Sequence, residues 1–100
     1  SIVVACSKDM VEDTIAHFDL GAVTYGLTLA AWERGLGTVI NGQGIMQSNV
    51  VREHAGIPDD QNIMICIAMG YPNEDFVAND VKSRREESDN FVRFVGFEDA

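Results

Sequence analysis

Residues Gly35 to Gly44 read Gly-Leu-Gly-Thr-Val-Ile-Asn-Gly-Gln-Gly, and this stretch decides the fold. It follows a run from Leu20 to Trp32 that contains no charged residue. The order predicts a buried helix that stops at a glycine, then a short strand, then a glycine-rich loop. Such a loop lets the backbone approach a flat ligand closely and offers it N–H donors.

Periodicity and turn residues place the other elements around this stretch. Apolar runs predict strands, helical spacing predicts helices, and Gly56 with Pro58 ends the second helix. Two alternatives stay open for the apolar end of the chain around Phe91 to Phe97, a short helix after Ser88 or an extended arm that packs on a partner. The expected elements are a strand at 2–6, a loop at 7–13, a helix from Thr14 or Asp19 to Arg34, a strand at 37–41, a loop at 42–44, a helix at 45–54, a strand at 62–70 and an exposed loop at 73–81.

The first helix is apolar on every side. One face carries apolar residues at spacings of three and four, and the other faces are just as apolar. A helix of this kind is buried on more than one side, and a chain of 100 residues can hardly provide packing surfaces for two sides of it. The pattern therefore predicts a second subunit or further sequence. The face in question is formed by Phe18, Ala22, Tyr25, Leu29 and Trp32.

Composition excludes several classes of function. A net charge of −9 with only seven Lys and Arg argues against a nucleic-acid partner. No apolar run reaches the length that a membrane span needs, which argues against a membrane protein. Cys6 and Cys66 lie in strand-like apolar runs and are interpreted as buried, reduced cysteines rather than a disulfide. With no signal of secretion, we expect a cytoplasmic protein.

No catalytic set of side chains is recognisable. His17 and His54 lack metal-ligand spacing with Cys, Asp or Glu, so we expect neither a metal site nor a catalytic side chain. A bound cofactor is then the expected reactive species. Lys82 and Arg84 stand at alternate positions in an acidic chain and could converge on one phosphate, although a solvated loop tip is the simpler interpretation of this pair alone. Together with the glycine-rich loop they indicate a phosphorylated planar cofactor.

An ordered set of motifs carries a family resemblance. The set resembles the C-terminal half of the nitroreductase family of FMN-dependent oxidoreductases and covers nearly the whole chain. Residues 1–100 are therefore expected to be the C-terminal portion of a single nitroreductase-like domain. The motifs are Gly35 to Gly44 after the long helix, Val-Arg-Glu-His-Ala-Gly-Ile-Pro at 51–58, Ile-Ala-Met-Gly-Tyr-Pro at 67–72 and Lys-Ser-Arg-Arg at 82–85.

The resemblance implies an α+β fold with a mixed central sheet flanked by helices, in an intertwined homodimer that holds FMN at the subunit interface. Backbone groups of Asn41, Gly42 and Gln43 would line the isoalloxazine near its N5 and O4 edge. Lys82 and Arg84 match the phosphate-binding basic pair of the family, and Arg85 is a substitute for one of them.

The implied reaction is hydride transfer from NAD(P)H through FMN to a nitroaromatic or quinone-like small-molecule acceptor. The Arg-rich segment that family members carry near their amino terminus has no match here, and the chain opens with Ser1 inside an apolar strand. We therefore expect a longer polypeptide to be the enzyme and residues 1–100 alone to be inactive. The alternative is a non-catalytic dimerisation or ligand-binding module derived from the same fold.

Overall fold

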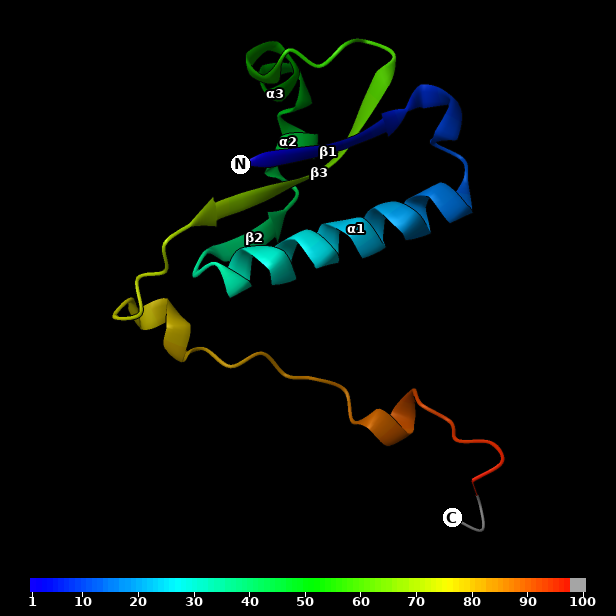
Figure 1. Ribbon diagram of the computed structural model, residues 1–100, viewed down its shortest axis with the longest axis vertical. Helices are drawn as coiled ribbons and strands as arrows, with labels where there is room; N and C mark the ends of the chain where they lie inside the picture. Colours follow the sequence, from blue (N-terminus) through cyan, green and yellow to red (C-terminus); the bar gives the residue numbers. More distant parts are fainter. Residues whose placement is uncertain (98–100) are drawn as a thin grey trace.

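A central antiparallel sheet organises the chain. The computed structural model describes residues 1–97, in which three strands, β1 (Ile2–Ser7), β2 (Gly37–Asn41) and β3 (Gln61–Gly70), pair in the order β1-β3-β2 (Figure 1). The longest strand, β3, lies in the middle, and both of its neighbours run antiparallel to it. This agrees with the strands expected from the apolar runs, which begin or end within one residue of those observed.

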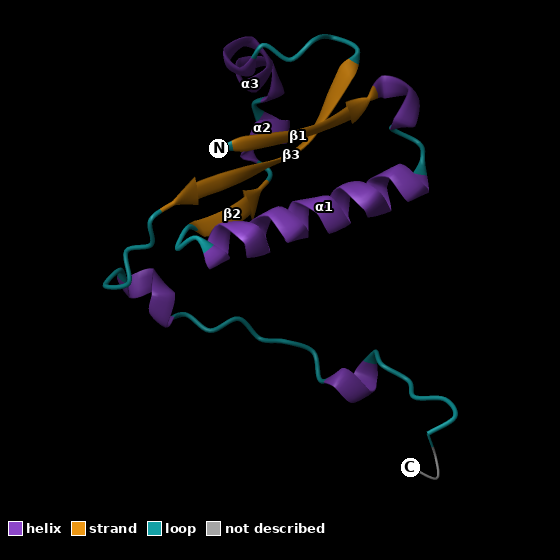
Figure 2. Ribbon diagram, in the orientation of Figure 1, coloured by secondary structure: helices purple, strands orange, loops and turns teal. Residues whose placement is uncertain are grey.

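Helices cover both faces of the sheet (Figure 2). Helix α1 (Thr14–Glu33) packs on one face, and the short helices α2 (Gln43–Met46) and α3 (Ser48–Ala55) lie on the other. The start of α1 is fixed by Asp13, whose carboxylate accepts hydrogen bonds from the N–H groups of Ile15 and Ala16. Its end is fixed by Gly35, which has a φ of 78°. The long helix therefore has the boundaries that its sequence predicts.

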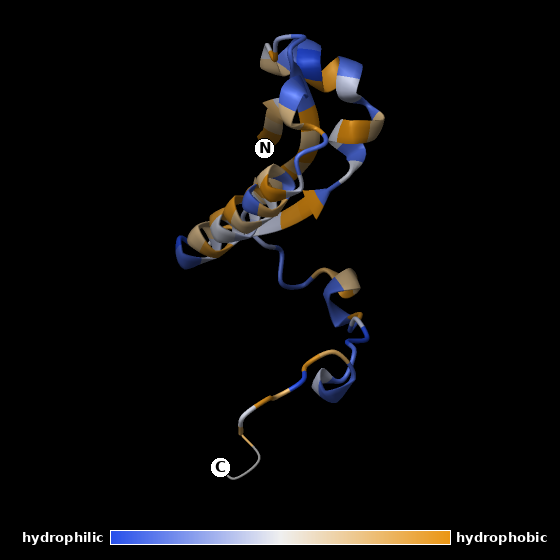
Figure 3. Ribbon diagram, turned by 90° about the vertical axis from the view of Figure 1, so that its right-hand side faces the viewer, coloured by the Kyte–Doolittle hydropathy of each residue, from blue (hydrophilic) through white to orange (hydrophobic). Residues whose placement is uncertain are grey.

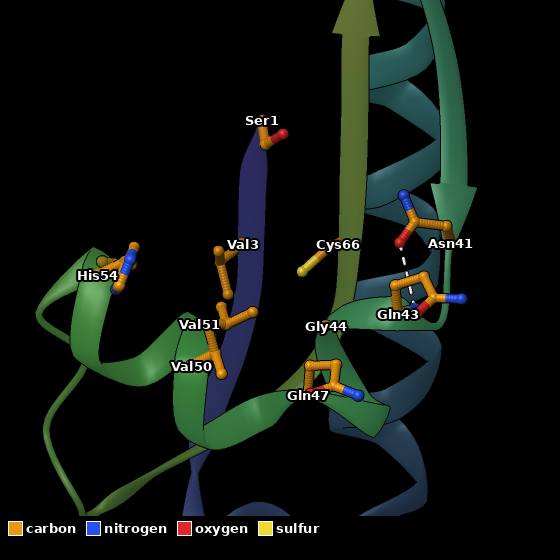
Figure 4. A pocket seen from close by; sticks show the side chains of 11 residues that line it. Ser1, Val3, Asn41, Gln43, Gly44, Gln47, Val50, Val51, His54 and Cys66 are labelled. Atoms are coloured by element: carbon orange, nitrogen blue, oxygen red, sulfur yellow. Dashed lines mark hydrogen bonds between the residues drawn. The ribbon is translucent and has the colours of Figure 1, made fainter.

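The prediction of one continuous helix at 45–54 is wrong, because the structure contains two helices in this region. Helix α2 begins two residues earlier, at Gln43, and the chain leaves the helical conformation at Gln47, where φ is −115° and ψ is 36°. Helix α3 ends as predicted, with Gly56 in the left-handed region at a φ of 66°. The bend at Gln47 lets α2 lie against β3 while α3 turns away (Figure 4).

The core of the described chain is small. Ile67 in the middle of β3 is fully buried, and the other buried apolar side chains are those of Val4, Ala31, Ile63 and Cys66. Neither cysteine is paired; Cys66 is buried as expected, whereas Cys6 is only partly buried. None of the helices within residues 1–97 has the length and apolarity needed to cross a bilayer.

The outer face of α1 is exposed in the single chain. Phe18, Tyr25, Leu29 and Trp32 each expose more than half of their side chains, so the face predicted from helical spacing is not the one that packs on the sheet. Thr24 and Ala31 from the opposite face are the buried residues of this helix. Apolar residues are spread along α1 in Figure 3. We call the exposed face the apolar stripe; it consists of Ile15, Phe18, Ala22, Tyr25, Leu29 and Trp32.

An extended arm, residues 71–97, leaves the end of β3 and runs away from the sheet (Figure 1). All of its residues are exposed, and its only regular structure is two short 3₁₀ turns at Val77–Asp80 and Ser88–Asn90. The arm raises the radius of gyration to 17.7 Å, against about 13 Å for a compact domain of this length. At the end of the described chain the structure has a short 3₁₀ turn at Ser88–Asn90 followed by an extended, exposed segment, and the packing of this segment on a partner stays a prediction.

Arg52 on α3 ties the following loop to the sheet. Its Nη1 donates to the carbonyl oxygens of Pro58 at 2.6 Å and Gln61 at 2.9 Å. We expect Arg52→Ala to lower the free energy of unfolding by about 1–2 kcal/mol, because both bonds involve a charged donor and one is partly buried. The change in the free energy of unfolding is measured by thermal unfolding of the variant and the wild type. Arg34→Ala is the control, since Arg34 bonds at 3.3 Å to Ala30 within its own helix and should cost less than about 0.5 kcal/mol. Equal losses in the two variants would contradict the prediction.

Candidate active site

The turn after β2 is held by its own hydrogen bonds. The side-chain Oδ1 of Asn41 accepts from the N–H of Gln43 at 3.2 Å. The carbonyl oxygen of Gly42 accepts from the N–H groups of Ile45 at 3.0 Å and Met46 at 3.2 Å. The loop expected at 42–44 is therefore shorter than predicted, because these bonds draw Gln43 and Gly44 into the first turn of α2.

A cavity of about 460 Å³ lies between this turn, helix α3 and the sheet (Figure 4). The three strands supply Val3, Asn41 and Cys66, and the two helices supply Gln43, Gly44 and Val51 among others. Val3 and Asn41 are the residues paired with Cys66 in the two ladders. Paired residues of neighbouring strands point to the same face of a sheet, which explains why all three line one cavity.

The cavity has the character of a small-molecule site. Its walls are mostly apolar, and amide side chains of Asn41, Gln43 and Gln47 provide polar groups. Its volume falls within the roughly 300–1,000 Å³ of ordinary ligand pockets. His54, predicted to be a surface residue at a helix end, is exposed in the last turn of α3 and also borders the cavity. Within residues 1–97, no three His, Cys, Asp or Glu side chains gather as metal ligands.

These residues fit the ring of a flavin. A Cβ placed on Gly42 would meet no atom within 4 Å, so a flat ligand can approach the backbone there. Within the described chain no carbonyl accepts a hydrogen bond from the N–H of Gly42. The N–H of Gln43 is already bonded to Asn41, and the N–H of Gly44 has no acceptor within the described chain, so Gly42 and Gly44 are the backbone donors of this turn that remain for a ligand.

Lys82 and Arg84 lie in the extended arm and do not line this cavity. The arm leaves β3 at Gly70, which pairs with Gly37, the first residue of β2, whereas Asn41 is its last residue (Figure 1). Both basic side chains are exposed, and no other residue of the described chain bonds to them in the structure. One chain in this conformation therefore brings Asn41, Gly42 and Gln43 together but leaves Lys82 and Arg84 apart from them.

Comparison with known proteins identifies the family. The profile of the nitroreductase family matches residues 4–71, about two thirds of the chain. The chain belongs to the nitroreductase family. The resemblance carried by the motifs is thereby confirmed, as is the α+β fold, with a sheet flanked by helices. The matched segment includes Asn41, Gly42 and Gln43 and ends before Lys82.

Two curated nitroreductase-family relatives are similar to this chain. A chloronitrobenzene nitroreductase from Comamonas testosteroni is 31% identical over 75 residues, which is 75% of this chain and 33% of that protein. A 4-nitrobenzoate reductase from Pseudomonas putida is 28% identical over 80 residues, which is 80% of this chain and 35% of that protein. The chain spans about a third of the length of these relatives.

Two residues that touch the turn were missed by the sequence analysis. The sequence indicates Cys66 only as a small buried hydrophobe, and Gly44 only as part of the glycine-rich loop. Neither Gly42 nor Gly44 has a positive φ, so neither glycine is required by backbone conformation. The contact between Gly44 and Cys66 depends on how β3 aligns with β2, and no local pattern in the sequence reveals that alignment.

Proposed function

We propose that the protein is an FMN-dependent oxidoreductase that transfers hydride from NAD(P)H to a nitroaromatic or quinone-like acceptor. The observation that carries this proposal is the cavity lined by Asn41, Gln43 and Gly44, three residues of the segment that matches the nitroreductase family. The two relatives, named as reductases of nitroaromatic compounds, support the choice of acceptor.

The residues of the turn would bind and orient the ring. The amide of Asn41 and the unbonded N–H groups of Gly42 and Gly44 would suit the polar edge of an isoalloxazine. The apolar part of the cavity around Val51 would suit its flat face. Lys82 and Arg84 would neutralise the phosphate, which requires the arm to reach the turn of its own chain or of a second one. Bound FMN would supply the redox chemistry, so no side chain of this chain is assigned as a catalytic acid or base.

A homodimer is part of the same proposal. The apolar stripe of α1 and the apolar residues of the arm are exposed in the single chain, and Figure 3 shows both regions. An exposed apolar surface of this kind marks an interaction site. A second copy would cover it, and it would add the second packing surface that the all-apolar helix needs. The proposed compartment is the cytoplasm, where NAD(P)H is available and free thiols stay reduced.

The test is an absorbance spectrum followed by an assay. The purified protein should show flavin bands or acquire them with added FMN, and should then oxidise NAD(P)H in the presence of 4-nitrobenzoate, a chloronitrobenzene or a quinone. We expect activity with at least one of these acceptors. A protein that neither carries nor takes up FMN would contradict the proposal.

The competing function is a non-catalytic dimerisation or ligand-binding module. It is favoured by the separation of Lys82 and Arg84 from the cavity in this structure. It predicts a stable dimer without flavin and without NAD(P)H oxidation. The same spectrum and assay therefore distinguish the two functions.

A further inference from the structure

Cys66 lies at the centre of the cavity floor. It occupies the middle strand between Val3 on β1 and Asn41 on β2, and its side chain points to the face that α2 covers (Figure 4). It is only 8% exposed. The residue that begins the candidate ring-binding turn, Asn41, is thus the immediate neighbour of this sulfur in the sheet.

Gly44 sits directly against this sulfur. A Cβ at position 44 would lie 2.0 Å from the Sγ of Cys66, 3.2 Å from its Cβ and 3.9 Å from Cγ2 of Val51. No side chain can occupy that space while the sulfur is there. Gly42 differs completely, because a Cβ there would meet nothing. The surroundings of the two glycines therefore differ: Gly42 has open space where a side chain would lie, whereas Gly44, which lines the cavity, is closed against the sheet.

The turn is fixed at both of its ends. At one end, the side chain of Asn41 holds the N–H of Gln43. At the other, the backbone of Gly44 rests on the sulfur, and the carbonyl of Gly42 bonds to Ile45 and Met46 of the same short helix. The turn is therefore held by contacts on both sides, so a change in the size of its support is expected to displace it.

We propose that Cys66 is a positioning residue: the volume of its sulfur beneath Gly44 sets where the Gly42–Gln43 peptide lies above the sheet. This inference rests on the proposed function, because it assigns the position of that peptide to the fit of FMN. The role assigned to the thiol is that of a spacer. Serine, which keeps the branching of the side chain and is only somewhat smaller, should let the turn settle slightly, whereas added volume at position 44 should displace the turn.

The experiment measures FMN affinity by quenching of flavin fluorescence and the midpoint potential of the bound flavin. Gly44→Ala is expected to weaken FMN binding about 10- to 100-fold, as overpacking of a buried contact does, and to shift the potential. Gly44→Ala combined with Cys66→Ala should recover most of the loss, because the approach of 2.0 Å disappears and the closest remaining one is 3.2 Å. Cys66→Ser alone should stay within about threefold of the wild type.

Ile67→Val is the matched control. Ile67 follows Cys66 on β3, is fully buried and points to the opposite face of the sheet, so its truncation weakens the fold without touching the cavity. It should leave the affinity and the potential unchanged. A purely structural role for Cys66 would make Ile67→Val and Gly44→Ala behave alike, and that result would overturn the inference.

The remaining outcomes are also decisive. If the wild type binds FMN and the double variant is no better than Gly44→Ala, the positioning role is wrong while the proposed function stands. If the wild type binds no FMN, the proposed function fails and this inference fails with it.

Discussion

Replacing Lys82 and Arg84 together with Ala is expected to weaken FMN binding by about 100- to 10,000-fold. Each side chain would contribute a charge-assisted hydrogen bond to the phosphate, which is worth about 1.5–3 kcal/mol, and tenfold in affinity corresponds to about 1.4 kcal/mol. Both side chains are exposed and make no bond to other described residues, so their removal should not affect the folded chain itself.

Titration with two flavins isolates the phosphate. FMN should bind the double variant far more weakly than the wild type, whereas riboflavin, which lacks the phosphate, should bind both proteins equally. Arg93→Ala is the matched control, because Arg93 is another exposed cation of the same arm. If FMN affinity is unchanged in the double variant, or if FMN and riboflavin weaken to the same extent, the arm does not bind the phosphate.

Local signals in the sequence predicted the main elements of the fold. Asp13 caps α1, and Gly35 and Gly56 end their helices with positive φ, all of which depend on residues within one or two turns of the helix end. The apolar run at 62–70 predicted β3 for the same reason. Elements fixed by neighbouring residues can be located from one sequence.

Features that depend on distant residues could not be located in this way. The end of α2 at Gln47 carries no Gly or Pro, and it follows from the packing of α2 on β3. The place of Cys66 beneath Gly44 follows from the register of β2 on β3. Asn41, Gly42 and Gln43 were predicted together because they are adjacent in sequence. Lys82 and Arg84 were grouped with them because two cations at alternate positions in an acidic chain suit a phosphate, and because they match the family pattern; the arm of this single chain does not bring them there.

Substituting Phe18 and Leu29 together with Glu is expected to dissociate the proposed homodimer, with its dissociation constant raised at least about 1,000-fold. Phe18 is 79% and Leu29 55% exposed in the single chain, so the isolated fold should tolerate both changes, at less than about 0.5 kcal/mol each. In a dimer that covers the apolar stripe, each carboxylate would be buried without a partner, at a cost of about 2 kcal/mol or more.

Sedimentation velocity at several protein concentrations measures this effect, and circular dichroism checks that α1 is still helical. Asn49→Glu supplies the matched control, because it adds the same carboxylate at an exposed position of α3, away from the apolar stripe. The control should sediment like the wild type and the double variant as a monomer. If the double variant remains a dimer, the apolar stripe is not the dimer interface. Another segment must then cover this face of α1, because water would otherwise contact the exposed side chains of Phe18, Tyr25, Leu29 and Trp32.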